Sequence, residues 1–78
     1  MDRKRLGERL KIARVRKGMS QMDLVVALEE HGVRLNQSAI GKVERGERNL
    51  YVHQLVALVH VLEISLDWAV YGGELSVS

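Results

Sequence analysis

The sequence of 78 residues contains no cysteine, no proline and no phenylalanine. Without cysteine the chain can form neither a disulfide bond nor a thiolate metal site, and this composition fits a reducing, cytoplasmic setting. The absence of proline removes the residue that most often interrupts a helix. The longest apolar stretches, residues 24–28 and 55–62, are shorter than the roughly 18 residues of a membrane-spanning helix. We therefore expect a helical domain that does not enter a membrane.

The formal net charge of +2 conceals a strong asymmetry along the chain. Residues 1–18 hold eight lysines and arginines against two acids, whereas residues 49–78 hold three acids and no lysine or arginine. A basic front and an acidic, apolar rear indicate a polyanion bound on one side of the molecule. A basic helix face that is merely exposed to solvent gives the same pattern, so charge alone leaves both interpretations open.

Apolar residues recur at helical spacing, and capping residues and glycines mark the ends of the repeats. This pattern predicts an all-α fold with helices over about residues 2–17, 20–31, 36–46, 50–62 and 65–71. The fourth of these is apolar on nearly all sides, which predicts burial in the middle of the domain or in a subunit contact. Residues 1–73 are expected to form the domain, and residues 74–78 a short flexible tail.

Three blocks of sequence lie in order along the chain: GMSQ at residues 18–21, IGKVERGER at 40–48 and ISLDW at 64–68. Together, at this spacing, they resemble the Cro and phage-repressor family of helix-turn-helix DNA-binding domains, over roughly residues 6–72. The resemblance implies a compact five-helix, lambda-repressor-like domain of the XRE type. It also implies a transcriptional regulator that needs no cofactor.

The sequence departs from the family pattern at four places. The stretch between the second and third helices is about five residues longer than the shortest family form, so the second helix or the turn must absorb the insertion. Leu50 replaces a common proline, and Tyr51 replaces a common capping serine or threonine, which makes Asn49 an alternative cap. Glu63 stands where a glycine usually ends the helix.

The start of the third helix carries the candidate base-reading residues. With Asn36 as the N-cap, Gln37, Ser38 and Lys42 fall on the outward face, where the family makes its base contacts. A glutamine can pair bidentately with adenine, and a lysine can donate to guanine O6 and N7. The alternative is an ordinary exposed polar helix start, and the resemblance favours contact with bases.

Four further residues are expected to contact the DNA backbone. By resemblance, Gln21 contacts a phosphate at the start of the second helix, where free amides and the helix dipole attract anions. Arg45, Arg48 and Asn49 follow the third helix and are expected to hold the backbone beside the groove, which fixes register without reading sequence. Weaker candidates for long-range attraction are Arg5, Arg9, Arg16 and Lys17.

Arg14 and Glu44 are expected to have a structural role. The resemblance makes them an internal ion pair that joins the first helix to the third, so we do not assign them to the DNA contact. Losing one partner of a buried pair costs about 3–5 kcal/mol.

The acidic rear holds the candidate dimer contact. Related repressors dimerise through their last helix, and Trp68, Val70, Tyr71 and Leu75 would supply an aromatic and aliphatic surface for a two-fold contact. The alternative for Trp68 is packing in the core of its own chain.

The histidines do not suggest a metal site or a catalytic site. His53 and His60 are two helical turns apart, about 10.5 Å along the axis, so one metal ion cannot bind both. We see no glycine-rich phosphate loop and no paired nucleophile and base, so we do not expect an enzyme.

Two functions from different classes remain open at this point. The first is a sequence-specific binder of double-stranded DNA, most simply a repressor that acts at the nucleoid as a homodimer on a two-fold operator. It could be a Cro-like regulator, an antitoxin-like autoregulator or a domain of a longer repressor. The second is a protein-interaction module on the same scaffold, which binds a protein partner through its C-terminal half.

Overall fold

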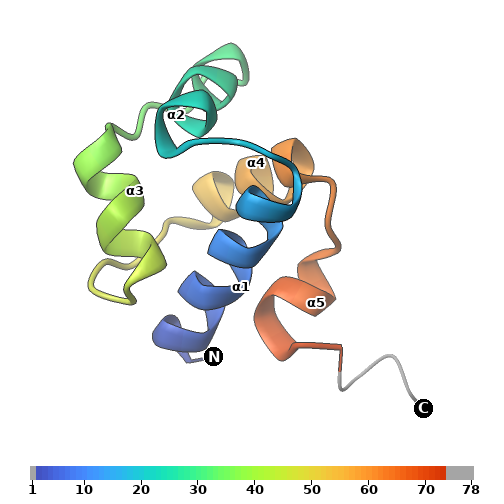
Figure 1. Cartoon of the computed structure of the whole chain (residues 1–78). Helices are drawn as coiled ribbons and strands as arrows, with labels where there is room; N and C mark the ends of the chain where they lie inside the picture. The colour runs from blue at the N-terminus through green and yellow to red at the C-terminus, as the bar shows by residue number, and fades with distance from the viewer. Residues whose placement is uncertain (1, 74–78) are drawn as a thin grey trace.

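Five helices make up the part of the chain that the computed structural model describes, residues 2–73 (Figure 1). No strand occurs in this part, which confirms the all-α, five-helix prediction. The predicted tail, residues 74–78, lies outside it. The helices are α1 (Arg3–Arg16), α2 (Gln21–Glu30), α3 (Gln37–Glu44), α4 (Val52–Leu62) and α5 (Leu66–Tyr71).

Four of the five helices begin at a side chain that caps the free backbone amides of the first turn. At α2 the cap is reciprocal, because Ser20 Oγ accepts from the Asp23 N–H at 3.0 Å and Asp23 accepts from the Ser20 N–H at 2.8 Å. This bond from the Ser20 backbone N–H lowers the pKa of the Asp23 carboxyl. The four predicted caps that the structure confirms are Asp2, Ser20, Asn36 and Ser65.

The start of α4 corrects the sequence interpretation. The N-cap is Tyr51 and not Asn49, and the helix begins at Val52, two residues later than expected. Tyr51 gives no capping side-chain bond, but Gln54 Oε1 accepts its backbone N–H at 2.9 Å. A glutamine at the third helical position can thus hold a helix start whose cap has no suitable side chain.

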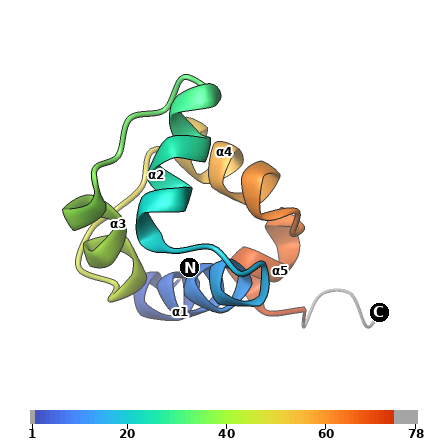
Figure 2. The ribbon, with the colours of Figure 1, turned by 45° about the horizontal axis from the view of Figure 1, so that its top comes forward.

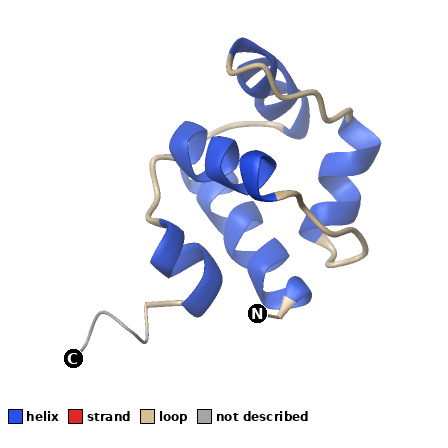
Figure 3. Cartoon of the chain, turned by 180° about the vertical axis from the view of Figure 1, so that it is seen from behind, coloured by secondary structure: helices blue, strands red, loops and turns tan. Residues whose placement is uncertain are grey.

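The helices pack around one small apolar core. Helix α1 packs against α3, α4 and α5, and α2 packs against α3 and α4. Figures 1, 2 and 3 show α3 and α5 on opposite sides of α1. The largest fully buried side chains come from four helices and are Leu10, Leu24, Leu28, Ile40 and Leu58.

Helix α4 is less buried than its composition predicted. Leu58 and Leu62 lie in the core, but the side chains of Val52 and Val56 are exposed, at 79% and 50%. Helix α4 nevertheless packs against α1, α2 and α5, so its burial on more than one side is confirmed, and the two valines lie on its remaining exposed side. A subunit contact over these valines stays a prediction.

The extra residues between α2 and α3 lie mostly in the turn. Residues 31–36 join the two helices, and Gly32 adopts a left-handed φ of +77° that reverses the chain. Val33 and Leu35 are buried in the core, so the long turn is anchored at two points. This anchoring gives α3 a defined orientation despite the insertion.

Helices α1 and α3 cross at Gly7. A Cβ built on this glycine would overlap the carbonyl oxygen of Val43 and lie 2.8 Å from that of Glu44. No side chain fits between the two backbones, so the close approach of α3 to α1 requires glycine here. The sequence analysis did not identify this residue.

Glu63 ends α4 in the left-handed conformation, with φ of 56°, as the glycine of the family pattern would. Its carboxylate accepts a hydrogen bond from Lys17 Nζ at 2.8 Å. This bond and the charge of Lys17 lower the pKa of Glu63.

We expect the Lys17–Glu63 pair to give a pH-dependent part of the stability. Because the pKa of Glu63 is depressed in the folded state, its contribution is present above the usual value of 4.5 and is lost as the pH falls below it. Urea unfolding at several pH values should find Glu63→Gln less stable than the parent near pH 7, with the difference shrinking below pH 4.5. The same substitution in a Lys17→Met background should show no such trend. A difference that stays constant with pH would contradict the assignment.

Candidate nucleic-acid interface

Helix α3 lies at the edge of the molecule (Figure 1), and its exposed face is polar. Gln37, Ser38 and Lys42 are exposed, while Ile40 and Val43 on the other side are buried. Burial of these two residues sets the rotation of the helix, and the Asn36 cap sets its start, because Asn36 Oδ1 accepts the Ala39 N–H at 2.8 Å. The three candidate base readers therefore share the outward face on which the sequence analysis placed them.

A hollow of about 410 Å³ joins the start of α2 to this face of α3. It brings together two of the candidate base readers with two of the candidate phosphate contacts. Lys42 lies outside it. The lining residues are Gln21, Gln37, Ser38, Gly41 and Arg45.

Arg14 and Glu44 form a bidentate ion pair beneath this hollow. Arg14 Nε lies 2.6 Å from Glu44 Oε2, and Arg14 Nη2 lies 3.1 Å from Glu44 Oε1. Both residues are buried, with 8% and 7% exposure, and Arg14 also donates to the Met19 carbonyl at 2.8 Å. The pair joins α1 to α3 and holds the turn before α2.

A chain of hydrogen bonds connects this ion pair to the exposed face. Gln21 Nε2 donates to Glu44 Oε1 at 3.1 Å, and Gln37 Nε2 donates to Gln21 Oε1 at 3.3 Å. Because an ionised carboxylate only accepts, Gln21 must turn its amino group toward Glu44 and its carbonyl toward Gln37. The Gln37 amide is thus oriented by Glu44 through Gln21.

This orientation leaves Gln37 with one N–H and its Oε1 free. Adenine presents one acceptor, N7, and one donor, the N6 amino group, in the major groove. The free groups of Gln37 match that pair.

Gly41 keeps the hollow open. A Cβ at this position would lie 3.1 Å from Arg45 Nη1 and 3.7 Å from Gln21 Nε2. The glycine in the middle of α3 therefore gives space to two side chains of the hollow.

The other candidate phosphate contacts lie beyond the end of α3. Arg45 is exposed and forms an ion pair with Glu47 at 3.1 Å. Arg48 and Asn49 are exposed and line a separate hollow, and Asn49 Oδ1 accepts from Arg3 Nη1 at 3.3 Å. The three residues are thus adjacent to the α3 face, but they do not converge in one pocket.

Three of the weaker cationic candidates have partners within the chain. Arg5 Nε lies 3.7 Å from Asp2 Oδ2 in an exposed ion pair. Arg9 Nη1 donates to the carbonyls of Ala69 and Val70 at 2.8 and 3.2 Å, which satisfies backbone groups in the last turn of α5. Lys17 pairs with Glu63. Arg9 therefore holds α5 on α1, a role that the sequence analysis missed.

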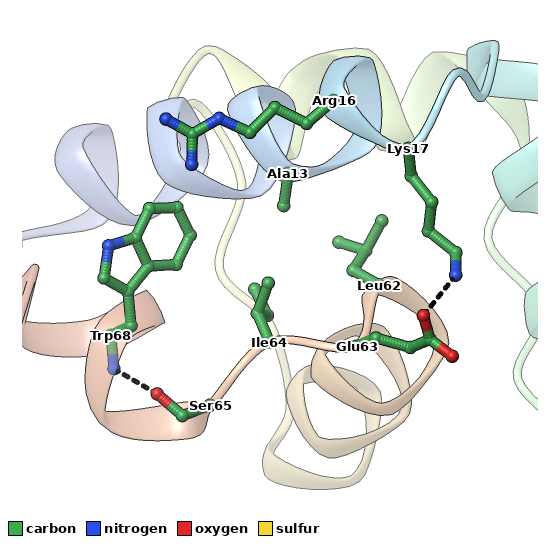
Figure 4. Close-up of a pocket in the computed structure, with 8 residues that line it drawn as sticks. All are labelled: Ala13, Arg16, Lys17, Leu62, Glu63, Ile64, Ser65 and Trp68. Carbon is green, nitrogen blue, oxygen red and sulfur yellow. Dashed lines mark hydrogen bonds and ion pairs between the residues drawn. The ribbon is translucent and has the colours of Figure 1, made fainter.

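The proposed dimer residues lie on and after α5. Trp68 is half-buried and packs against the core, as the alternative for this residue held, and Tyr71 is exposed. Trp68, Ala13, Leu62 and Ile64 line a hollow of about 450 Å³. Figure 4 shows the indole among these residues. Val70 is half-buried, and Leu75 lies outside the described residues.

Within residues 2–73, none of the helices has the length and apolarity required to cross a bilayer.

Comparison with known proteins identifies the class. A family model described as a helix-turn-helix domain matches residues 5–67. The chain is also similar to the crystal structure of the restriction-modification controller protein C.AhdI from Aeromonas hydrophila. The two share 34% sequence identity and a TM-score of 0.71, over 82% of this chain and 89% of that chain. No curated protein matches the sequence.

The chain belongs to the helix-turn-helix family of the Cro and repressor type. It is a DNA-binding transcriptional regulator. The resemblance noted from the three sequence blocks is thereby confirmed.

Proposed function

We propose that the chain is a sequence-specific repressor that binds double-stranded DNA with α3 in the major groove. The observation that carries the proposal is the orientation of Gln37 by Glu44 through Gln21. An amide held in one orientation before binding loses less entropy on binding and discriminates donor from acceptor. Gln37, Ser38 and Lys42 read the bases in this proposal.

The proposed phosphate contacts follow from the placement of α3 in the major groove. Gln21 lies at the start of α2, and Arg45, Arg48 and Asn49 lie just beyond the end of α3. When α3 enters the groove, these residues face the two flanking backbones. The pairing of Arg45 with Glu47 weakens its expected contribution, because Glu47 competes with phosphate.

We further propose that the regulator acts as a homodimer on a two-fold operator at the nucleoid. To read two half-sites in successive major grooves, the reading helices of two copies must lie about 34 Å apart, one turn of DNA. Helix α5 lies on the far side of α1 from α3, so a contact there leaves both reading helices free (Figure 2). The residues for this contact are Trp68, Val70, Tyr71 and Leu75.

A second candidate is a protein-interaction module, which the exposed apolar surface of α4 favours. Tyr51, Val52 and Val56 are exposed at 71%, 79% and 50%. Salt separates the two functions, because DNA binding weakens log-linearly with a slope of about −0.9 per phosphate neutralised. A contact through this apolar surface would change little with salt.

The test is selection of bound sequences from a random duplex library at one stated salt concentration. We expect a motif with two-fold symmetry from the parent. Gln37→Ala should keep the symmetry and lose the preference at one adenine in each half-site, at a cost of about 1–3 kcal/mol. Asp67→Asn, an exposed change on α5, should leave the motif unchanged. The similarity to a restriction-modification controller protein makes promoters of such systems useful additional probes.

The possible results separate the proposals. A motif without two-fold symmetry would exclude the dimeric operator but would still support base reading by α3. An unchanged motif with Gln37→Ala would exclude this residue as a base reader. If no motif is enriched, and if the small amount of duplex that the protein retains does not depend on the salt concentration, the result would support the protein-interaction module.

A further inference from the structure

The first turn of α1 lies against the turn that follows α3, although the two are far apart in sequence. A Cβ built on Gly46 would lie 2.6 Å from the Cα of Lys4, so the two backbones are in contact. Beside this contact, Arg3 Nη1 donates to Asn49 Oδ1 at 3.3 Å. Figures 1 and 2 show the start of α1 beside the segment that follows α3. The fold thus adds the start of α1 to the candidate phosphate contacts beyond the end of α3.

The hydrogen bond from Arg3 fixes the direction of the Asn49 side-chain amide. A guanidinium has donors and no acceptor, so only the oxygen of Asn49 can face it, and the amino group must point elsewhere. Asn49 is exposed, and no residue within 2–73 accepts a hydrogen bond from this amino group. Phosphate oxygens accept hydrogen bonds, so the free end of Asn49 is the end that a phosphate requires.

The same corner of the molecule has an excess of positive charge. Arg3 and Arg48 are exposed, and neither forms an ion pair with any residue in the part of the chain that the structure describes. The acids beside them in sequence, Asp2 and Glu47, each pair with another arginine, at 3.7 and 3.1 Å. The charge of Arg3 and Arg48 therefore remains available to an anionic partner.

We infer that the start of α1 is part of the DNA contact, and that Arg3 and Asn49 together bind one backbone phosphate. The Asn49 amino group donates to one phosphate oxygen, and the remaining N–H groups of Arg3 donate to another. The inference rests on the proposed function, because α3 in the major groove places the turn after α3 against a flanking backbone. Arg3 then has two roles, as a ligand of the phosphate and as the group that orients Asn49.

This pair lies outside the hollow that Gln21 and Gln37 line, so it holds the backbone at a separate point. Phosphate contacts fix the register of a protein on the duplex and carry no sequence information. Loss of Arg3 should therefore weaken binding to every duplex by a similar factor, whereas loss of a base reader should weaken binding to the selected sequence alone.

The test measures binding of the full chain to two probes by fluorescence anisotropy over a series of salt concentrations. The probes are the duplex that the parent selects from the random library and a duplex of random sequence. Arg3→Met should bind both probes roughly tenfold more weakly, the effect of losing one charge-assisted hydrogen bond. The slope of log affinity against log salt should become shallower by about 0.9 for each copy bound, because one phosphate fewer is neutralised.

Arg16→Met is the matched control for the charge. It removes the same charge from the same helix, but Arg16 lines the hollow beside Trp68, on the side of α1 that faces α5 (Figure 4). The salt slope should therefore stay at the parent value. Arg3 is exposed, so thermal unfolding should find Arg3→Met close to the parent.

Two further variants separate the charge of Arg3 from its orienting role. Arg3→Gln keeps a donor for Asn49 without the charge, so the slope should become shallower and the loss of affinity should be smaller than with Arg3→Met. Asn49→Ala removes a neutral donor and should weaken binding to both probes with the slope unchanged. Combined with Arg3→Met, it should cost less than the product of the two separate losses, because Asn49 is no longer oriented when Arg3 is absent.

Equal salt slopes for Arg3→Met and Arg16→Met would overturn the inference. A loss confined to the selected duplex would also overturn it, because Arg3 would then read a base. In both cases the parent keeps its motif and its salt dependence, so the proposed function stands. A parent that binds neither probe, or binds without dependence on salt, would overturn the proposed function and this inference with it.

Discussion

Glu44→Ala is expected to destabilise the domain by about 3–5 kcal/mol, because it leaves the Arg14 guanidinium buried without its counter-charge. The exposure of Arg14 is only 8%, so water cannot replace the two lost charge-assisted bonds. The core of a domain of this size rarely supplies more than about 3–5 kcal/mol of stability, so a large fraction of the variant should be unfolded at 37 °C.

Urea unfolding followed by circular dichroism measures this effect. Glu47→Ala is the matched control, because it removes an exposed carboxylate whose pair with Arg45 is expected to contribute less than about 1 kcal/mol. The double variant Arg14→Met, Glu44→Leu should recover much of the loss, since a buried apolar pair needs no counter-charge. A Glu44→Ala midpoint equal to that of Glu47→Ala would refute the structural role of the pair.

Gly7→Ala is expected to destabilise the domain at or above the upper end of the range of about 1–3 kcal/mol for overpacking. The new methyl group would overlap the Val43 carbonyl, and a backbone atom in a packed helix cannot move aside as a flexible side chain can. Alanine is favoured over glycine in a helix by about 1 kcal/mol, so the clash must exceed this gain for the predicted sign to hold.

Gly41→Ala is the control, because it makes the same change inside another helix. Its Cβ would meet the end of the Arg45 side chain at 3.1 Å, and this flexible group can move. We therefore expect Gly41→Ala to be neutral or stabilising in the same urea experiment. Should Gly7→Ala unfold at a higher urea concentration than the parent, the backbone crossing at this residue would be looser than the structure indicates.

The two glycines also separate stability from function. Gly41→Ala places a methyl group in the hollow between Gln21 and Arg45, so we expect it to alter the DNA contact more than the unfolding free energy. Gly7 lies in the crossing of α1 and α3, away from that hollow.

The features that the sequence alone predicted correctly are local ones. The caps Ser20 and Asn36 bond to amides three residues away, and the apolar spacing of α3 decides which side chains face outward. Such interactions involve neighbours along the chain, so their residues can be recognised without knowing the fold. The family resemblance added the pairing of Arg14 with Glu44.

Only the tertiary structure decided the contacts between distant residues. Arg9 holds α5 through carbonyls 60 and 61 residues away, and His31 meets His60 because the long turn is anchored in the core. Gly7 is required for the same reason, because the α3 backbone that lies against it is distant in sequence. These contacts depend on how whole helices pack. The same caps and apolar spacing are compatible with many arrangements of the helices, and burial of the apolar faces together selects one of them.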